Sequence, residues 1–257
     1  MSEWQWRLAI FFGVWLALML AERSVAYAAN PTPWTRAGRH LAMALLGTAL
    51  TRVVLPLGAI GAAAWAAQHG IGALHQFDAG WVEFVLALVA LDLAIYWQHR
   101  ATHAWPPLWR LHRVHHTDAV LDASTALRFH PIEIALSMAY KVVVVVALGI
   151  DPLAVLVFEI VLNATALFSH ANMQLPERID RALARLIVTP AMHRVHHAPD
   201  AQRTNSNYGF CLSIWDRLFG SFRGFRHRQD GEGFGVAGMV ADESVTAMLK
   251  RPFGGLR

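Results

Sequence analysis

Residues 81–103 read WVEFVLALVALDLAIYWQHRATH, an apolar stretch that ends in two histidines four positions apart. A helix needs about 20 predominantly apolar residues to cross a bilayer. Histidines at positions i and i+4 share one helix face, so His99 and His103 can grip one metal ion between them. The stretch therefore predicts a membrane-spanning helix that carries part of a metal site at its end.

The composition supports a membrane protein. Of the 257 residues, 55% are hydrophobic and only 16% are charged, against roughly 25% charged in ordinary soluble domains. The net charge is +4, and no basic run is interleaved with aromatic residues, so nucleic-acid binding is not expected. Arginines beside anionic lipid headgroups explain the charge better. The single cysteine, Cys211, excludes a disulfide framework or an iron–sulfur cluster ligated by cysteines of one chain.

Four further apolar stretches predict additional spans, at residues 8–21, 41–67, 132–149 and 152–169. The sequence therefore predicts an all-α integral membrane protein with about four to five transmembrane helices. A cleavable signal peptide is the alternative for residues 8–21. Arg52 lies inside the second stretch, so it is expected either near a membrane interface or facing the protein interior.

The last two stretches predict a helical hairpin, because only Gly149, Ile150, Asp151 and Pro152 separate them. Glycine can end one helix, and proline suits the first turn of the next. Lys141 and Glu159 lie nine residues on either side of Ile150. Since a charge in a membrane helix needs a partner, we expect these two side chains to meet.

The distribution of basic residues predicts the orientation. The loop at 68–80 has no lysine or arginine, whereas the segments 22–40, 98–131 and 170–257 carry many. Cytoplasmic loops carry the excess of basic residues. The N-terminus is therefore expected outside, and the histidines are expected on the cytoplasmic side.

Histidine is the most informative residue type. The chain has fourteen, ten of them between positions 99 and 197. The motif HRVHH occurs at 112–116 and again at 193–197. Adjacent histidines on a helix project about 100° apart and can address two different metals. Eight motif imidazoles are too many for one tetrahedral zinc, which takes four ligands, so two metals are predicted to share them: His99, His103, His112, His115, His116, His193, His196 and His197.

The phrases around these motifs carry a family resemblance. They read YWQHRATH (96–103), LWRLHRVHHTD (108–118), STALRFHPIE (124–133), FSHANMQLP (168–176), TPAMHRVHH (189–197) and NSNYGFCLSIWDRLFGSF (205–222). Together they resemble the fatty acid hydroxylase / sterol desaturase superfamily of integral-membrane di-iron enzymes. The resemblance is to its bacterial sterol-desaturase-like branch, which is itself similar to alkylglycerol monooxygenase, and it covers roughly residues 81–226.

Hydropathy predicts membrane anchor helices at 1–80, and the glycine-rich segment 227–257 is expected to be an irregular tail. The resemblance implies a catalytic domain at 81–226. It implies a cytosolic helical cap that holds two iron ions on the eight motif histidines, in a bacterial inner membrane. His170 and His130 are candidates for further ligands, and the alternative for His130 is a structural histidine that starts a helix before Pro131. Some relatives have a second HxxxH motif where this chain has His170 followed by Gln174, so the ninth and tenth ligands stay open.

Several polar residues are expected beside the histidines. Asp92 lies seven residues before His99 on the same helix face, so it is predicted either to orient a ligating imidazole or to satisfy an interior polar contact. The phrase NSNYG at 205–209 is predicted to be a turn that places polar groups near the last histidines. The same orienting role is predicted for Asp118, Asn172 and Asn207.

The predicted function is oxidation of a lipid C–H bond, either hydroxylation or desaturation, of a fatty-acyl, aminolipid or sterol-type substrate. Ether-lipid cleavage and carotenoid hydroxylation stay open. This chemistry needs a metal centre that activates dioxygen, and zinc is a possible substitute for iron in purified protein. No dinucleotide fingerprint, haem motif or cysteine set is present, so a ferredoxin, cytochrome or reductase partner is expected to supply electrons. The alternative is a zinc or iron transporter or sensor without oxygenase activity.

Overall fold

The computed structural model describes residues 3–73, 80–227, 233–239 and 244–254. Within these residues the regular structure is helical, with two isolated β-bridges and no extended strand. The elements are α1 (Glu3–Ala21), α2 (Pro33–Val54), α3 (Gly58–Gln68), α4 (Trp81–Ala104), α5 (Pro106–His116), η2 (Ala123–Leu127), α6 (Pro131–Leu148), α7 (Pro152–His170), α8 (Glu177–Leu183), α9 (Pro190–His196), α10 (Ala201–Thr204), α11 (Ile214–Leu218), α12 (Val245–Lys250) and η3 (Arg251–Phe253).

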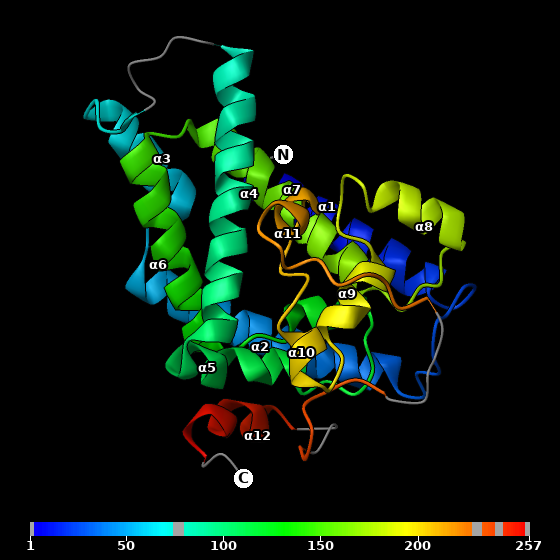
Figure 1. Ribbon diagram of the computed structural model, residues 1–257. Coiled ribbons are helices and arrows are strands. Elements are labelled where there is room, and N and C mark those ends of the chain that lie inside the picture. Colours follow the sequence, from blue (N-terminus) through cyan, green and yellow to red (C-terminus); the bar gives the residue numbers. More distant parts are fainter. Residues whose placement is uncertain (1–2, 74–79, 228–232, 240–243, 255–257) are drawn as a thin grey trace.

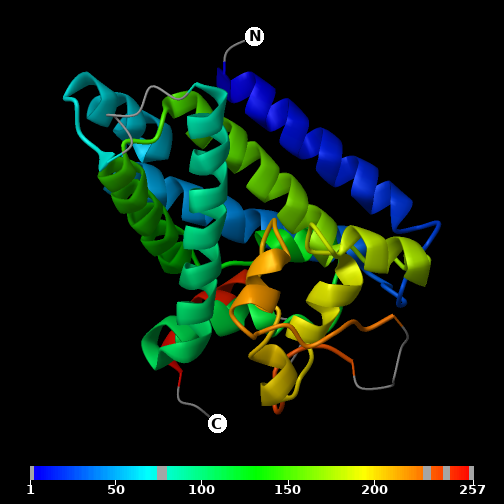
Figure 2. The ribbon, with the colours of Figure 1, turned by 45° about the horizontal axis from the view of Figure 1, so that its top comes forward.

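Four segments of the described chain are long and apolar enough to cross a membrane. They are Pro33–Gln68, Trp81–Ala104, Pro131–Leu148 and Pro152–His170, and Gln5–Ala21 is a shorter apolar helix. Figure 1 shows α3, α4 and α6 standing side by side, while α1 and α7 run together at an angle to them, as Figure 2 also shows. The predicted all-α membrane fold is confirmed.

The second predicted span is not one continuous helix. α2 ends at Val54 and α3 begins at Gly58, with Pro56 between them. Proline has no N–H to donate and disfavours helical backbone at the residue before it, which explains the break. Arg52 lies in the last turn of α2 and is exposed, so the alternative in which it faces the protein interior is wrong.

The α6–α7 hairpin is confirmed. Gly149 adopts a left-handed φ of 67° after α6, a conformation that glycine accepts without strain. The Asp151 carboxylate accepts a hydrogen bond from the N–H of Leu153 at 2.7 Å and so caps α7. Between the two helices, Lys141 Nζ lies 2.8 Å from Glu159 Oε1, and both residues are buried. The predicted ion pair is therefore confirmed.

The ends of the chain are attached to this bundle in ways the sequence did not indicate. Arg7 of α1 reaches Glu159 at 2.5 Å, so three helices share one carboxylate. The predicted irregular tail contains α12 and η3, and Met248 of α12 packs against Met43 and Val114. A tail that is irregular throughout is therefore a wrong expectation, while the domain boundaries at 80 and 226 stay predictions.

Candidate metal centre

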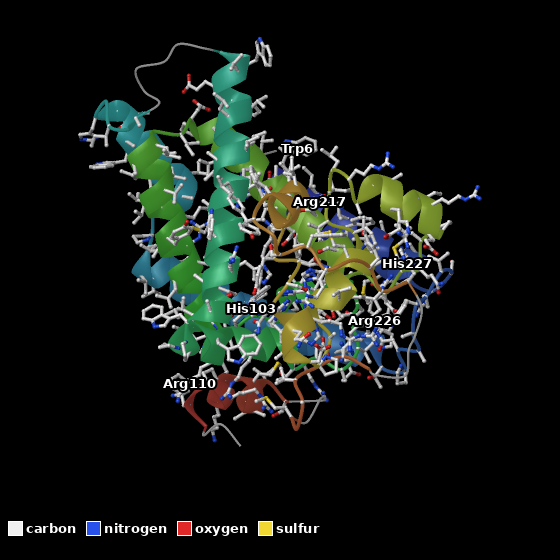
Figure 3. All side chains as sticks on the ribbon, viewed as in Figure 1. Trp6, His103, Arg110, Arg217, Arg226 and His227 are labelled. Atoms are coloured by element: carbon white, nitrogen blue, oxygen red, sulfur yellow. The ribbon has the colours of Figure 1, made fainter. Side chains whose placement is uncertain are left out.

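Nine histidines form two buried groups at the end of the membrane helices, and each residue offers one ring nitrogen within 4.8 Å of the others in its group. The five-histidine group consists of His99, His103, His112, His116 and His196. The four-histidine group consists of His115, His170, His193 and His197. All are buried except His103, which is partly exposed. Figure 3 shows His103 at the end of α4 that lies next to α5.

Proline and capping residues start the helices that carry these side chains. α5 begins with Pro106 and Pro107, where a missing N–H costs nothing. α9 begins with Pro190, and the Thr189 hydroxyl caps it by accepting from the N–H of Met192. Both HRVHH motifs thus lie on short helices that present several imidazoles to the same interior space.

Each of the two HRVHH motifs contributes histidines to both groups. In each motif the first and fifth residues belong to one group, while the fourth belongs to the other. His115 and His116 are separated in this way, and so are His196 and His197. Adjacent histidines therefore address different groups, as their angular spacing on a helix predicts.

The spacing within each group fits a shared ion. The Nε2 atoms of His170 and His115 lie 3.0 Å apart, and those of His193 and His170 lie 2.9 Å apart. In the other group, His99 Nε2 and His112 Nε2 lie 3.2 Å apart. Two nitrogens bound at right angles, each about 2.1 Å from one ion, are about 3 Å apart. The residues present therefore match the donor set of a metal such as iron, zinc or copper.

Unpartnered ring nitrogens also point to a bound ion. Burying a polar atom without a partner costs about 1–3 kcal/mol. Among the described residues, buried nitrogens without a hydrogen-bond partner occur in six of the nine histidines: His103, His115, His116, His193, His196 and His197. In His103, His116 and His196 the unpartnered atom is Nε2, and in His197 both ring nitrogens are unpartnered, so a metal ion within the groups would satisfy these side chains. In His115 and His193 the unpartnered atom is Nδ1, while Nε2 faces His170.

Backbone carbonyls and one carboxylate orient four of the rings through Nδ1. His99 Nδ1 lies 2.7 Å from the Tyr208 carbonyl and His196 Nδ1 lies 2.7 Å from the Ser206 carbonyl. The α7 histidine uses its own helix, since His170 Nδ1 lies 2.7 Å from the Ala166 carbonyl. A carbonyl can only accept, so each of these Nδ1 atoms carries the proton and leaves Nε2 as a lone-pair donor.

The fourth ring reveals a residue that sequence reasoning missed. His112 Nδ1 lies 2.5 Å from Glu133 Oε1, and both residues are buried. A carboxylate on the outer nitrogen makes the ring a better metal ligand. Glu133 is the one acidic residue of the largely apolar helix α6 and lies in its first turn, which was the available signal in the sequence.

Burial keeps five imidazoles of the two HRVHH motifs neutral. Burial, reinforced by neighbouring imidazoles, lowers the pKa of His115, His116, His193 and His197 well below the usual value. Burial likewise lowers the pKa of His196 to about 3. Neutral imidazole is the form that binds a metal, so these side chains are ready to ligate at neutral pH.

One candidate ligand lies elsewhere. His130 is outside both groups, at the start of α6. Its Nδ1 accepts a hydrogen bond from the N–H of Ile132 at 3.2 Å, and its Nε2 lies 3.2 Å from the Leu249 carbonyl. The contacts of His130 fit the alternative of a structural histidine, because one ring nitrogen caps α6 and the other lies beside the tail.

Two predicted orienting carboxylates have other partners. Asp92 accepts hydrogen bonds from the N–H of Leu212 at 3.0 Å and from Trp215 Nε1 at 2.8 Å. It therefore takes the interior polar role and ties the loop after α10 to α4. Asp118 pairs with Arg36 at 2.6 Å. Burial alone would raise the pKa of the Asp118 carboxyl. The neighbouring cations, Arg36 above all, have the larger effect and lower this pKa to about 2.

The two asparagines hold backbone segments instead of imidazoles. Asn172 exchanges hydrogen bonds with the N–H and the carbonyl of Ala28, at 2.9 and 2.8 Å. Asn207 donates to the Met192 carbonyl at 2.9 Å, next to the start of the second HRVHH motif. In the same loop, Asn205 Oδ1 lies 3.3 Å from His103 Nδ1. The 205–208 turn thus does place polar groups beside histidines.

The fold and the site define a class: helical membrane proteins with a buried candidate metal centre built from histidines. Comparison with known proteins is consistent with this class. A family model described as fatty acid hydroxylase matches residues 84–221. The chain therefore belongs to the fatty acid hydroxylase family, and the resemblance predicted from the motifs is confirmed.

Three relatives illustrate the similarity. An ornithine lipid hydroxylase, OlsE, of Rhizobium tropici is 33% identical over 66% of this chain and 50% of its own length. The alkylglycerol monooxygenase of Danio rerio is 32% identical over 57% of this chain and 31% of its own length. The lathosterol oxidase of Mus musculus is 27% identical over 66% of this chain and 56% of its own length. The chain thus spans about a third to just over half of the length of these relatives, and no solved structure matches it.

Proposed function

We propose that the protein is a membrane-bound di-iron oxidoreductase that uses O2 and external electrons to hydroxylate or desaturate a C–H bond of a lipid. The observation that carries the proposal is the pair of buried histidine groups at the end of the membrane helices. Its relatives include a hydroxylase, a monooxygenase and an oxidase named for lipid substrates, so we favour a fatty-acyl, aminolipid or sterol-type substrate.

In this proposal the nine grouped histidines are the metal ligands. Two iron ions held by them would activate dioxygen, which acid–base chemistry of side chains cannot do. The chain's own residues orient the rings through Nδ1 and exclude water by burial. The helices below the groups would hold the acyl or sterol chain. Asn205 and Glu133 contact the rings of His103 and His112 from outside the groups, and Asn207 holds the backbone at Met192, next to His193.

The electron donor and the membrane side belong to the same proposal. Hydroxylation inserts one atom of O2 into a C–H bond and reduces the other to water, which consumes two electrons and two protons. A separate ferredoxin, cytochrome or reductase would supply those electrons. We place the protein in a bacterial inner membrane with the histidine groups on the cytoplasmic side, as the basic segments predict.

The test compares lipid extracts of cells that express the protein with those that express His193→Ala/His196→Ala, which removes one residue from each group. His69→Ala is the matched control, because His69 is exposed, directly follows α3 and is outside both groups. Cells would grow under labelled dioxygen with a competent electron donor. We expect a lipid that gains one labelled oxygen only with the intact protein and the control.

The other outcomes are equally informative. A lipid that loses two hydrogens and gains no label would assign a desaturase. Unchanged lipids, combined with one exchangeable zinc per chain in place of two irons, would contradict the proposal and favour a metal transporter or sensor. Oxidised lipid from the double variant would contradict the role of the histidine groups.

A further inference from the structure

Two short helices outside the metal centre form an exposed apolar surface, which we call the α8–α11 face. Leu186 is 66% exposed and Leu218 is 65% exposed. The other large apolar side chains exposed on this surface are Ile179, Leu183 and Ile214. Single exposed apolar residues are normal on a protein, but a contiguous group of them marks an interaction site.

Hydrogen bonds make the two parts of the face continuous. The hydroxyl of Ser213, before α11, donates to the Ala184 carbonyl after α8 at 2.7 Å. Arg217 of α11 donates to the same carbonyl at 2.7 Å, and the N–H of Ser213 donates to the Leu186 carbonyl at 3.1 Å. The segment after α8 and the start of α11 are therefore joined by hydrogen bonds, so their exposed side chains belong to adjoining parts of the surface.

In and around the two helices the basic side chains are exposed, whereas the aspartates are buried. Four arginines of this region are exposed: Arg178, Arg181, Arg185 and Arg217. The aspartates of the same helices are buried, where Asp180 accepts from Thr189 and Asp216 accepts from the N–H of Gly209. Glu177 is the exposed acid, and it pairs with Arg181. The outer surface is thus apolar with a basic rim.

The position of the face relates it to the membrane helices. In Figures 1 and 2, α10 and α12 lie near the lower end of α4, while α8 and α11 lie part of the way up, beside the bundle. The face therefore lies on the same side of α10 and α12 as the apolar length of α4. A bilayer around the spans would meet this surface.

We propose that the α8–α11 face lies in the interfacial region of the leaflet nearest the histidine groups. Its leucines and isoleucines would contact acyl chains, and its arginines would contact anionic headgroup phosphates. Leucine and isoleucine flanked by arginine are typical of segments that lie in the membrane surface. A basic rim also favours anionic lipid over neutral lipid. This contact would hold the histidine groups at one depth relative to the leaflet, and it does not depend on the proposed catalytic function.

The test uses the full chain in vesicles with spin labels on Leu186→Cys and Leu218→Cys. Phe253→Cys is the matched control, because Phe253 is also apolar and 71% exposed but follows α12. Cys211 is buried, and the unaltered chain serves as the labelling blank. We expect oxygen to relax the labels at 186 and 218 strongly and a water-soluble nickel complex to reach them weakly, with the reverse at 253.

Three results would overturn the proposed location. Strong nickel access at 186 and 218 would place the face in water, and shielding from both reagents would indicate a protein partner or a second copy. Lipid-like values at all three positions would also contradict the proposal, because the face would not differ from the rest of the surface.

A second experiment tests the proposed contacts between the arginines and anionic lipid. In phosphatidylcholine vesicles with added phosphatidylglycerol, the label at 218 should move to a more lipid-like environment than in phosphatidylcholine alone. Arg178→Gln/Arg185→Gln should abolish that shift, whereas Arg110→Gln/Lys250→Gln, exposed on α5 and α12, should keep it. A shift that survives the first pair would exclude a role for those arginines.

Discussion

Glu133 shows how much a single side chain outside the ligand groups contributes to them. Its carboxylate accepts the Nδ1 proton of His112 at 2.5 Å. That contact selects the tautomer whose Nε2 faces the other histidines, and it increases the electron density of the ring. Neutral backbone carbonyls select the same tautomer in His99, His170 and His196, but they carry less negative charge than a carboxylate.

We expect Glu133→Gln to weaken metal binding by the five-histidine group by roughly 10–100-fold, the usual cost of losing such a partner. Competition with a chelator, followed by metal analysis, measures this change. Glu177→Gln is the control, since Glu177 is exposed on α8. Unchanged affinity in Glu133→Gln would show that the contact does not tune His112.

At this scale the motif histidines were predictable and their partners were not. Helical spacing indicates which imidazoles of one helix can act together, so the motifs singled out the eight histidines. The fold brings the histidines of α4, α5 and α9 together into the two groups. His170 came only from the resemblance. The carbonyls of Ser206 and Tyr208 leave no mark in a sequence, because any residue has one. Asp92 was assigned to the right helix face, but only tertiary contacts show that it binds the loop at 211–215.

Among the elements, the α6–α7 hairpin rests on an ion pair inside the membrane region. Lys141 and Arg7 both contact the Glu159 carboxylate, from α6 and α1. Removing one partner of a buried pair leaves a charge without compensation and costs about 3–5 kcal/mol in soluble proteins.

We therefore expect Lys141→Met and Glu159→Leu each to lower the thermal unfolding midpoint clearly. The double variant Lys141→Met/Glu159→Leu should be more stable than the sum of the single changes predicts. Thermal unfolding in detergent measures all three against the parent chain. Strictly additive losses would contradict coupling between the two side chains.

Local sequence signals explain why the hairpin was predictable and the break before α3 was not. Gly149, Asp151 and Pro152 each have a positional preference at a helix end. Pro56 has one too, but it lies within a long apolar stretch, and hydropathy alone cannot separate a kinked span from two helices. α12 was missed because its burial depends on Met43 and Val114, which are distant in sequence.

For the whole molecule, the buried imidazoles predict a pH dependence of stability. The pKa values of His115, His116, His193 and His197 lie well below the ordinary value in the folded state, and that of His196 is about 3. The unfolded chain therefore binds more protons than the folded chain once the pH falls below about 6.5. Their contribution to folding is complete above that pH and is lost as the pH falls toward the folded values.

We expect the thermal unfolding midpoint to decrease as the pH is lowered from about 6.5 to about 5. Bound metal should be released over the same range, because protons compete for the same nitrogens. Unfolding and metal content measured along a pH series test this. His193→Gln/His196→Gln should flatten the dependence. A midpoint that rises on acidification would contradict the sign.

The division of each HRVHH motif between the two groups has a consequence for assembly. Each group takes histidines from both α5 and α9. Under the proposed di-iron function, the first ion to arrive would therefore already immobilise the two helices that the second ion needs. Part of the entropic cost of building the second site would then be met in advance, and loading would be cooperative. A chain with one ion would accordingly be scarce at equilibrium, and loss of a single imidazole would affect occupancy of both positions.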